Sequence, residues 1–340
     1  MQNKTLSTTL STTIILAGLI GSSAACAGTM PTIYGQLNLG LLNADNDEAE
    51  RVWQTENQAS RLGIKGEQAL ENGLALIYQY ETGIHPAENE KPIFSQRNSF
   101  VGISSPYGEI ITGNFDTPLK AAQAKVDLFN DTHFDMSEFL AGEVRHKQSV
   151  QYTSPTLLNA ISAQLDWLPA AEKAAKDGYS AALHYRSSLF EMSVAADHQV
   201  AGDSGVLIGK SAALENLRVQ ASFSPIERLK VGLIAQQSKG LDDDQSVENG
   251  WLASAAWSAE KLTLKAQIGQ GTASKDAAGE DSDASIRQAS LGVDYSLGKN
   301  TLAYAYSGIR QTKNGAGDTS TDGKNSNSTA STGFGLKYKF

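Results

Sequence analysis

The feature that most limits how this chain can fold is an alternation of apolar and polar side chains with a period of two residues. In 216–223, Leu217, Val219, Ala221 and Phe223 alternate with polar residues, and segments 33–41, 74–81, 179–186, 262–268 and 334–340 follow the same pattern. Successive side chains of a β-strand point to opposite faces, so this pattern predicts strands. No run of 18 apolar residues follows the first 27 residues. The chain is therefore expected to be all-β, without a transmembrane helix.

The connections between these segments alternate between short and long. We expect short turns at 67–73, 104–108, 154–157, 186–189, 224–228, 258–261 and 297–300. We expect long loops at 43–58, 85–95, 116–147, 169–177, 199–211, 239–249, 271–284 and 311–329. Fifteen connections join sixteen antiparallel strands. Short periplasmic turns, long extracellular loops and an even strand number are typical of a transmembrane β-barrel of the bacterial outer membrane. A barrel of this size encloses water.

Composition agrees with such a barrel and limits the partners. Only 40% of the residues are hydrophobic and 19% are charged, which is too polar for a bundle of membrane helices. The net charge of −9 makes nucleic acid an unsuitable partner. The five histidines lack the spacing of a zinc site, and no catalytic or phosphate-binding motif is present. We therefore expect no cofactor, no metal and no enzymatic activity.

Residues 1–27 read as a secretory signal peptide. Lys4 gives the positive start, 13–21 is a short apolar run, and Ala25-Cys26-Ala27 has the small residues of a cleavage site. Cys26 is the only cysteine; lipidation there is the less favoured alternative because Ser23 stands where a lipoprotein signal has leucine. The exported domain is then 28–340.

Five segments carry a family resemblance: YGQLNLGL, SRLGIKGEQALENGLALIYQYE, RNSFVGISSPYGEIITGNFD, RHKQSVQYTSP and the final GFGLKYKF. They resemble the general porins of Gram-negative bacteria. The resemblance implies a homotrimer in the outer membrane, surrounded by lipid and lipopolysaccharide, and diffusion of small hydrophilic solutes. It also implies that the terminal Phe340 is read by the outer-membrane assembly machinery.

The same resemblance implies a pore constriction. In the family the third loop, here 116–147, folds into the lumen and faces a basic wall. The resemblance aligns Arg61, Arg97 and Arg145 with the wall cluster, and Asn114 stands where the family usually has a further arginine. The acids of the loop are Asp116, Asp127, Asp131, Asp135, Glu138 and Glu143. Arginine on one side and carboxylates on the other would set a field across the pore.

Other interpretations stay open at this point. The arginines could be ordinary solvated lumen residues, and the loop acids a solvated charge run. Aromatic residues near strand ends could form interfacial girdles or an ordinary core: Tyr78, Tyr80, Trp167, Trp251, Trp257, Tyr304, Tyr306, Tyr338 and Phe340. The function could instead be that of a substrate-selective porin, a structural or adhesive barrel, or a soluble β-sandwich. The sign of ion selectivity does not follow from the sequence.

Overall fold

A computed structural model describes residues 30–46, 49–86, 92–170, 176–201, 213–242, 244–314 and 326–340, so the predicted signal peptide lies outside the described residues. The described strands are β1 (Thr32–Asn46), β2 (Ala49–Asn57), β3 (Arg61–Ala69), β4 (Ala75–Ile84), β5 (Phe94–Ser105), β6 (Gly108–Asp116), β7 (Arg145–Thr153), β8 (Ile161–Leu168), β9 (Gly178–Arg186), β10 (Phe190–Ala201), β11 (Ala213–Ile226), β12 (Leu229–Gly240), β13 (Val247–Ala259), β14 (Leu262–Lys275), β15 (Ser285–Ser296), β16 (Thr301–Lys313) and β17 (Ser326–Lys339). Helical turns are the α-helix α1 (Pro118–Ala121) and the 3-10 helices Glu71–Gly73 and Met136–Glu138.

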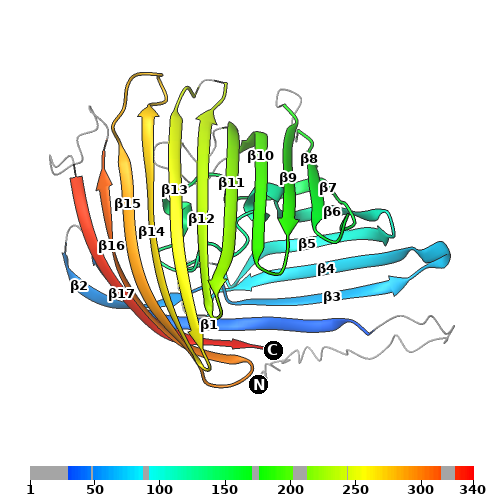
Figure 1. The fold of residues 1–340 in the computed structure, drawn as a ribbon, viewed down its shortest axis with the longest axis horizontal. Helices are drawn as coiled ribbons and strands as arrows, with labels where there is room; N and C mark the ends of the chain where they lie inside the picture. The colour runs from blue at the N-terminus through cyan, green and yellow to red at the C-terminus, as the bar shows by residue number, and fades with distance from the viewer. Residues whose placement is uncertain are drawn as a thin grey trace, which may run out of the picture.

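All these strands belong to one antiparallel sheet that closes on itself, because β1 pairs with β17 (Figure 1). β2 and β3 are two halves of one barrel strand, since both pair with β1 on the same edge. The barrel therefore has sixteen strands, as the sequence predicted. Closure leaves no unpaired strand edge, which is what a sheet surrounded by lipid requires.

The prediction of a first long loop at 43–58 was wrong, because most of this segment is the strand β2. This segment is polar and lacks clear alternation, but its backbone pairing with residues 39–46 of β1 holds it in the sheet. The break between β2 and β3 is a local irregularity at 58–60, where Ala59 has a positive φ of 53°. Asn38 stabilises it by donating from its Nδ2 to the carbonyl of Gln58 at 2.8 Å.

The predicted short turns all lie at one end of the barrel, and the described long connections begin and end at the other (Figure 1). Strands β12, β13, β14 and β16 extend a few residues into expected loops, because their backbone pairing continues past the apolar stretch. Most of the polar residues without regular secondary structure therefore lie at the end with the long loops.

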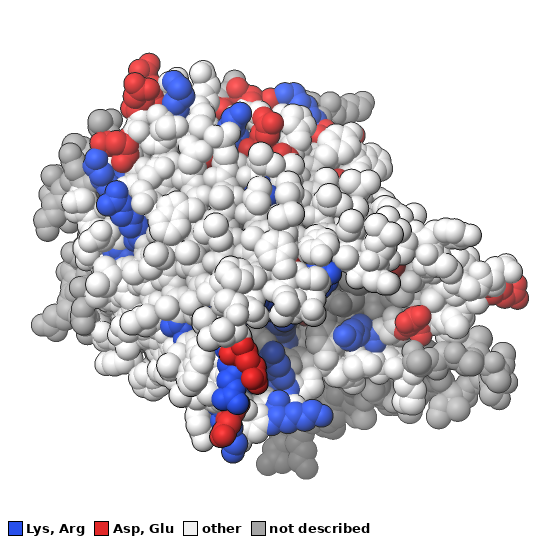
Figure 2. All heavy atoms as spheres, in the orientation of Figure 1, with Lys and Arg blue, Asp and Glu red and all other residues white. Residues whose placement is uncertain are grey.

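The apolar face of each strand points outward and the polar face points inward. In β11, Leu217 is 53% exposed on the outer surface, whereas its neighbours Arg218 and Gln220 are fully buried inside. On the face that Figure 2 shows, charged side chains gather towards the top and the bottom, and the area between them is mostly uncharged. This is the reverse of a soluble β-sandwich, whose apolar face is internal.

Two tyrosines depart from the expected aromatic girdle. Tyr304 and Tyr306 of β16 are buried on the inner side, with their rings stacked 6.2 Å apart. The Tyr306 hydroxyl donates to Glu56 Oε2 at 2.7 Å. Alanines occupy the outward positions next to these tyrosines, Ala303 and Ala305, so the sequence pattern of this strand does not distinguish its two faces. Trp167, Trp251 and Trp257 do lie exposed on the outer surface. Among the described residues no helix is long and apolar enough to cross a membrane.

Candidate functional site

The connection between β6 and β7, residues 117–144 (loop 3 from here on), lies against the inner wall of the barrel. Thr117 begins the fold of the loop by capping α1, accepting a hydrogen bond from the Lys120 backbone amide, and Pro118 follows at the first helical position. α1 packs on β8, β9 and β10. Asp135 caps the second turn by accepting from Ser137 N at 2.8 Å. Local capping therefore shapes the loop, and contacts with the wall place it.

The apolar side chains of loop 3 sit over inward-facing glycines of the wall. At each of five such glycines, an added Cβ would lie within 2.9 Å of a loop side chain. The pairs are Val126 on Gly232, Leu140 on Gly250, Phe139 on Gly269, Phe129 on Gly292 and Phe134 on Gly308. They run across five consecutive strands, β12 to β16. The glycines thus form a row of shallow seats that lets the loop approach the sheet backbone closely.

We expect Gly269→Ala to loosen loop 3. The new Cβ would lie 2.3 Å from Phe139 Cζ, so the buried ring must move. Overpacking of this kind costs about 1–3 kcal/mol. The check is urea unfolding of the refolded barrel in detergent, together with noise in single-channel current. Gly298→Ala, in a turn with open space around the glycine, is the matched control and should leave both unchanged. Equal behaviour of the two variants would mean that the seats do not hold the loop.

A buried arginine fastens the loop to β11. The Arg218 guanidinium lies 2.5 Å from Glu143 Oε1 of the loop, and it also donates to the carbonyl oxygens of Leu119 and Ala141 at 3.2 Å each. Its Nε donates to Gln236 on the neighbouring strand at 2.7 Å. Both ends of loop 3 are therefore tied to one side chain, since Leu119 lies near its start and Glu143 near its end.

Asp127 fastens the middle of the loop. Its carboxylate accepts from the backbone amides of Phe129 and Met136, each at 2.9 Å, and from Gln267 Nε2 of β14 at 2.9 Å. Burial raises the pKa of Asp127 to about 7, the negative charge of Asp135 adds to the effect, and the three donors oppose it. Asp127 is therefore a structural residue of the loop.

The wall opposite loop 3 carries the three arginines, on the alternate strands β3, β5 and β7. Glu81 of β4 lies among them: Arg97 Nε donates to Glu81 Oε1 at 2.6 Å, and Arg61 Nε lies 3.7 Å from Glu81 Oε2. The Tyr34 hydroxyl donates to the same Oε2 at 3.0 Å. One nearly buried carboxylate therefore sets the position of two of the three guanidinium groups.

Arg145 is held by a second carboxylate. Its Nη2 lies 2.9 Å from Asp116 Oδ1, and its Nε donates to Asn98 Oδ1, which in turn fixes Asp116 through a 3.1 Å bond from Asn98 Nδ2. Lys120 of α1 lies 3.5 Å from Asp116 as well. Asp116 is the last residue of β6, so it stands on the wall beside Arg145 and not across the lumen from it.

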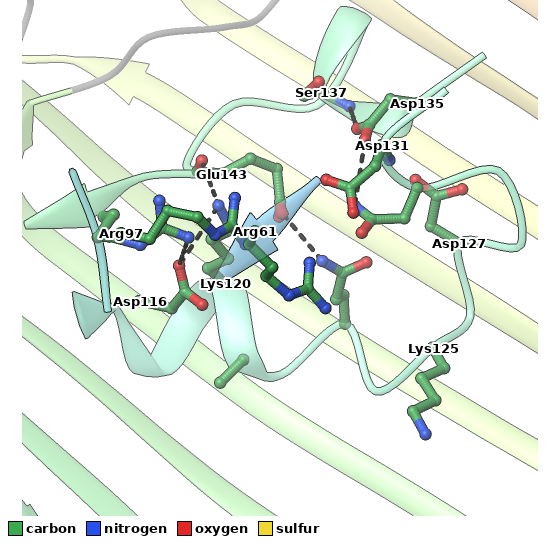
Figure 3. A pocket seen from close by; sticks show the side chains of 14 residues that line it. Arg61, Arg97, Asp116, Lys120, Lys125, Asp127, Asp131, Asp135, Ser137 and Glu143 are labelled. Atoms are coloured by element: carbon green, nitrogen blue, oxygen red, sulfur yellow. Dashed lines mark hydrogen bonds and ion pairs between the residues drawn. The ribbon is translucent and has the colours of Figure 1, made fainter. Parts of the chain in front are cut away.

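Loop 3 and this wall enclose one opening with a volume of about 530 Å³. It is lined by Arg61, Arg97, Asp116, Lys120, Ala121, Gln123, Lys125, Asp127, Asn130, Asp131, Asp135, Ser137, Glu143 and Arg145. Figure 3 shows Arg61, Arg97 and Lys120 gathered on one side, and Asp131 and Asp135 on the other. We call this space the charged opening.

The six predicted loop acids fall into different environments. Asp131 is exposed at the charged opening, and Asp135 is half-buried there as a helix cap. Asp127 and Glu143 reach the opening only at their edges because each is more than nine-tenths buried in contacts with the wall. Glu138 is outside the lining and pairs with Arg310 of β16 at 3.1 Å.

The sequence interpretation gave no role to three residues that shape this site, Glu81, Lys120 and Lys125, and it considered Arg218 only as a further lumen charge. The alternation around Glu81 and Arg218 placed both on the inner face, but it gave no sign of their partners. Lys120 and Lys125 add positive charge to loop 3 itself. The sequence interpretation did not include this charge because it considered only the acidic residues of the loop. Among the described residues no group of three or more His, Cys, Asp or Glu side chains could hold a metal ion.

Known proteins resemble the chain in sequence and fold. The family model described as "Gram-negative porin" matches residues 11–316. The chain is 26% identical over 332 residues to the major outer membrane protein P.IB of Neisseria lactamica, a match that covers 91% of this chain and 94% of that protein. The solved anion-selective porin from Comamonas acidovorans superposes with a TM-score of 0.76 at 18% identity, over 92% of this chain and 99% of that one. The trimer form of OmpT from Vibrio cholerae gives 0.67 at 16% identity, over 92% and 99%.

Proposed function

Because this chain belongs to the Gram-negative porin family and forms a channel in the outer membrane, we propose that the charged opening is its constriction. Small hydrophilic solutes and ions pass through it by diffusion. The observation that carries this proposal is the separation of charge across one opening, with Arg61, Arg97 and Lys120 on one side and Asp131 and Asp135 on the other (Figure 3).

The separated charges act on a solute through the field between them. A dipolar solute gains by aligning with the field, whereas an apolar solute loses contact with water and gains nothing. Not every charge contributes equally. Asp116 and Glu143 are engaged with Arg145 and Arg218, so their fields are largely local. Arg61 is 3.7 Å from its carboxylate, and Lys125 forms no ion pair within the described part of the chain.

Diffusion and selective transport differ in how flux depends on solute concentration. In a diffusion pore the flux rises linearly, and in a selective pore it saturates and is blocked by the ligand. The lining favours diffusion because it is formed almost entirely by charged and polar side chains on one open passage. Solute sites that discriminate usually combine an apolar cavity with a few polar groups. Saturating flux in liposomes would favour the selective alternative.

The constriction is tested by replacing two wall arginines, Arg61→Gln with Arg97→Gln. We expect the reversal potential of a planar bilayer in a salt gradient to shift towards cations. A unit charge about 6 Å from the ion path is worth about 0.7 kcal/mol in water, or roughly threefold in the permeability of each ion, in opposite directions for cations and anions. Arg228→Gln, in an exposed turn, is the control with the same change of charge. An unchanged reversal potential in the double variant would remove these arginines from the narrow section.

We also propose the assembly and surroundings that the family resemblance implied. A homotrimer is supported by the trimer form of OmpT, which shares the fold. Contacts with lipid and lipopolysaccharide, and the lack of an enzymatic activity, remain predictions. For Phe340 as an assembly signal, the support is its place at the barrel seam: its amide and carbonyl pair with Gly35 of β1 at 3.1 and 3.0 Å.

A further inference from the structure

Behind loop 3 lie two buried aspartates that do not line the charged opening. Asp166 of β8 and Asp197 of β10 both pair in register with Ser180 of the strand between them, β9. All three side chains point inward at the same height, and each is at most 3% exposed. α1 covers this place from the lumen side, with the Leu119 amide donating to Ser180 Oγ at 3.2 Å.

Buried apolar side chains flank the two aspartates on both sides along the strands. Towards the long loops lie Leu168, Val200 and Val144, which form one buried cluster. Towards the short turns lie Leu119, Ala122, Ala182 and Ala195, which form another. Two carboxylates in such a position are costly unless a positive charge or a set of donors accompanies them.

The protein itself supplies little positive charge and few hydrogen-bond donors to these two carboxylates. Both oxygens of Asp166 and Oδ1 of Asp197 have no hydrogen-bond partner within the described part of the chain. Asn216 of β11, 1% exposed, is directed at the same place because its Nδ2 donates to Asp197 Oδ2 at 3.2 Å, and its own Oδ1 also lacks a partner. The nearby guanidinium of Arg218 is engaged by Glu143, Gln236 and two backbone carbonyls.

We propose that Asp166 and Asp197 bind one hard divalent cation of the calcium type between the barrel wall and α1. All four atoms without partners are oxygen acceptors, and oxygen is the ligand that such cations take. Two strands separated by a third are about 10 Å apart at the backbone, and side chains converge on the concave inner face. Carboxylates leaning towards Ser180 can then approach one ion at the usual distance of about 2.4 Å.

Hard cations of this type take about six to eight oxygen ligands, so hydroxyl, carbonyl, amide and water oxygens would complete the shell around the two carboxylates. The Ser180 hydroxyl and the Asn216 amide are the polar groups beside them. An ion here would fasten α1, and with it the start of loop 3, to β8, β9 and β10. This role is independent of the constriction, since neither aspartate lines the charged opening.

The experiment measures calcium on the refolded full-length barrel after treatment with a chelating resin. Equilibrium dialysis against calcium should show a bound ion in the wild type that is lost in Asp166→Asn with Asp197→Asn. The control, Asp242→Asn with Asp244→Asn, removes outer-loop carboxylates and should keep that ion. The proposal is wrong if the wild type binds no calcium, or if the Asp166/Asp197 variant binds as much as the wild type.

The second measurement is thermal unfolding of the wild type and of the same variant. We expect the thermal unfolding midpoint of the wild type to rise with calcium and fall with a chelator, and the Asp166/Asp197 variant to lose this dependence. The opposite result is an unfolding midpoint of the wild type that does not change with calcium, together with a higher midpoint for the variant. That result would show that the two carboxylates carry protons instead, and it would overturn the proposal. Conductance in monovalent salt does not enter either result, so failure here is distinct from failure of the proposed constriction.

Discussion

Replacing Arg218 by methionine is expected to detach loop 3 from the barrel wall. The change leaves Glu143 buried without its cation, and it removes the donors to the carbonyls of Leu119 and Ala141. Burial already raises the pKa of Glu143, and Arg218 is the largest influence that opposes this. Breaking a buried ion pair by removing one partner costs about 3–5 kcal/mol. We expect a large loss of stability, and open-channel currents that are larger and noisier than those of the wild type.

The measurement is single-channel recording alongside urea unfolding of the same preparation. Adding Glu143→Gln to Arg218→Met removes the stranded charge, so the double variant should regain much of the lost stability. Arg228→Met, an exposed arginine in a turn, is the matched control and should behave as the wild type. Wild-type conductance and noise in Arg218→Met would show that the glycine seats hold loop 3 without this ion pair.

Glu81→Gln is expected to shift ion selectivity in the direction opposite to the arginine substitutions. Glu81 pairs with Arg97 at 2.6 Å and lies 3.7 Å from Arg61, so it cancels part of their positive charge beside the charged opening. Glutamine keeps the shape of the side chain but removes the charge. The reversal potential in a salt gradient should move towards anions, because one charge at about 6 Å changes the permeability of each ion by roughly threefold, in opposite directions for anions and cations.

The same variant also frees the two guanidinium groups to move, because a neutral amide holds them less tightly than a carboxylate. A control of equal charge change is Glu260→Gln, in a short turn away from the charged opening. If Glu81→Gln folds, as judged by heat-resistant migration in gels, and leaves the reversal potential unchanged, the wall around Arg61 and Arg97 does not face the ion path.

The sequence predicted most of the fold. Alternation in strands such as β11 identified the two faces, and the short and long links gave sixteen barrel strands. The exception was 43–58, where β2 lacks alternation and exists because the edge of β1 pairs with it. Backbone pairing needs no particular side chain, so a polar segment beside an unpaired edge can become a strand without any signal of its own.

The candidate site was predicted in part. The resemblance named Arg61, Arg97 and Arg145, and all three line the same opening. The loop acids were grouped by sequence position alone, and the structure separates them into exposed, capping and buried residues. A carboxylate in a 28-residue loop has no periodic face, so its environment depends on how the loop packs. Alternation gave the inner or outer face of Glu81 and Arg218 but not their partners.

The sequence by itself determined the strands, their apolar outer face and their polar inner face, because a two-residue period is a local property that each strand carries alone. Only the tertiary structure decided which inward side chains meet. The five glycines of the wall look unremarkable along the chain, and they become seats for loop 3 only when five strands lie side by side. Contacts between residues far apart in sequence depend on barrel closure and register, which no single segment encodes.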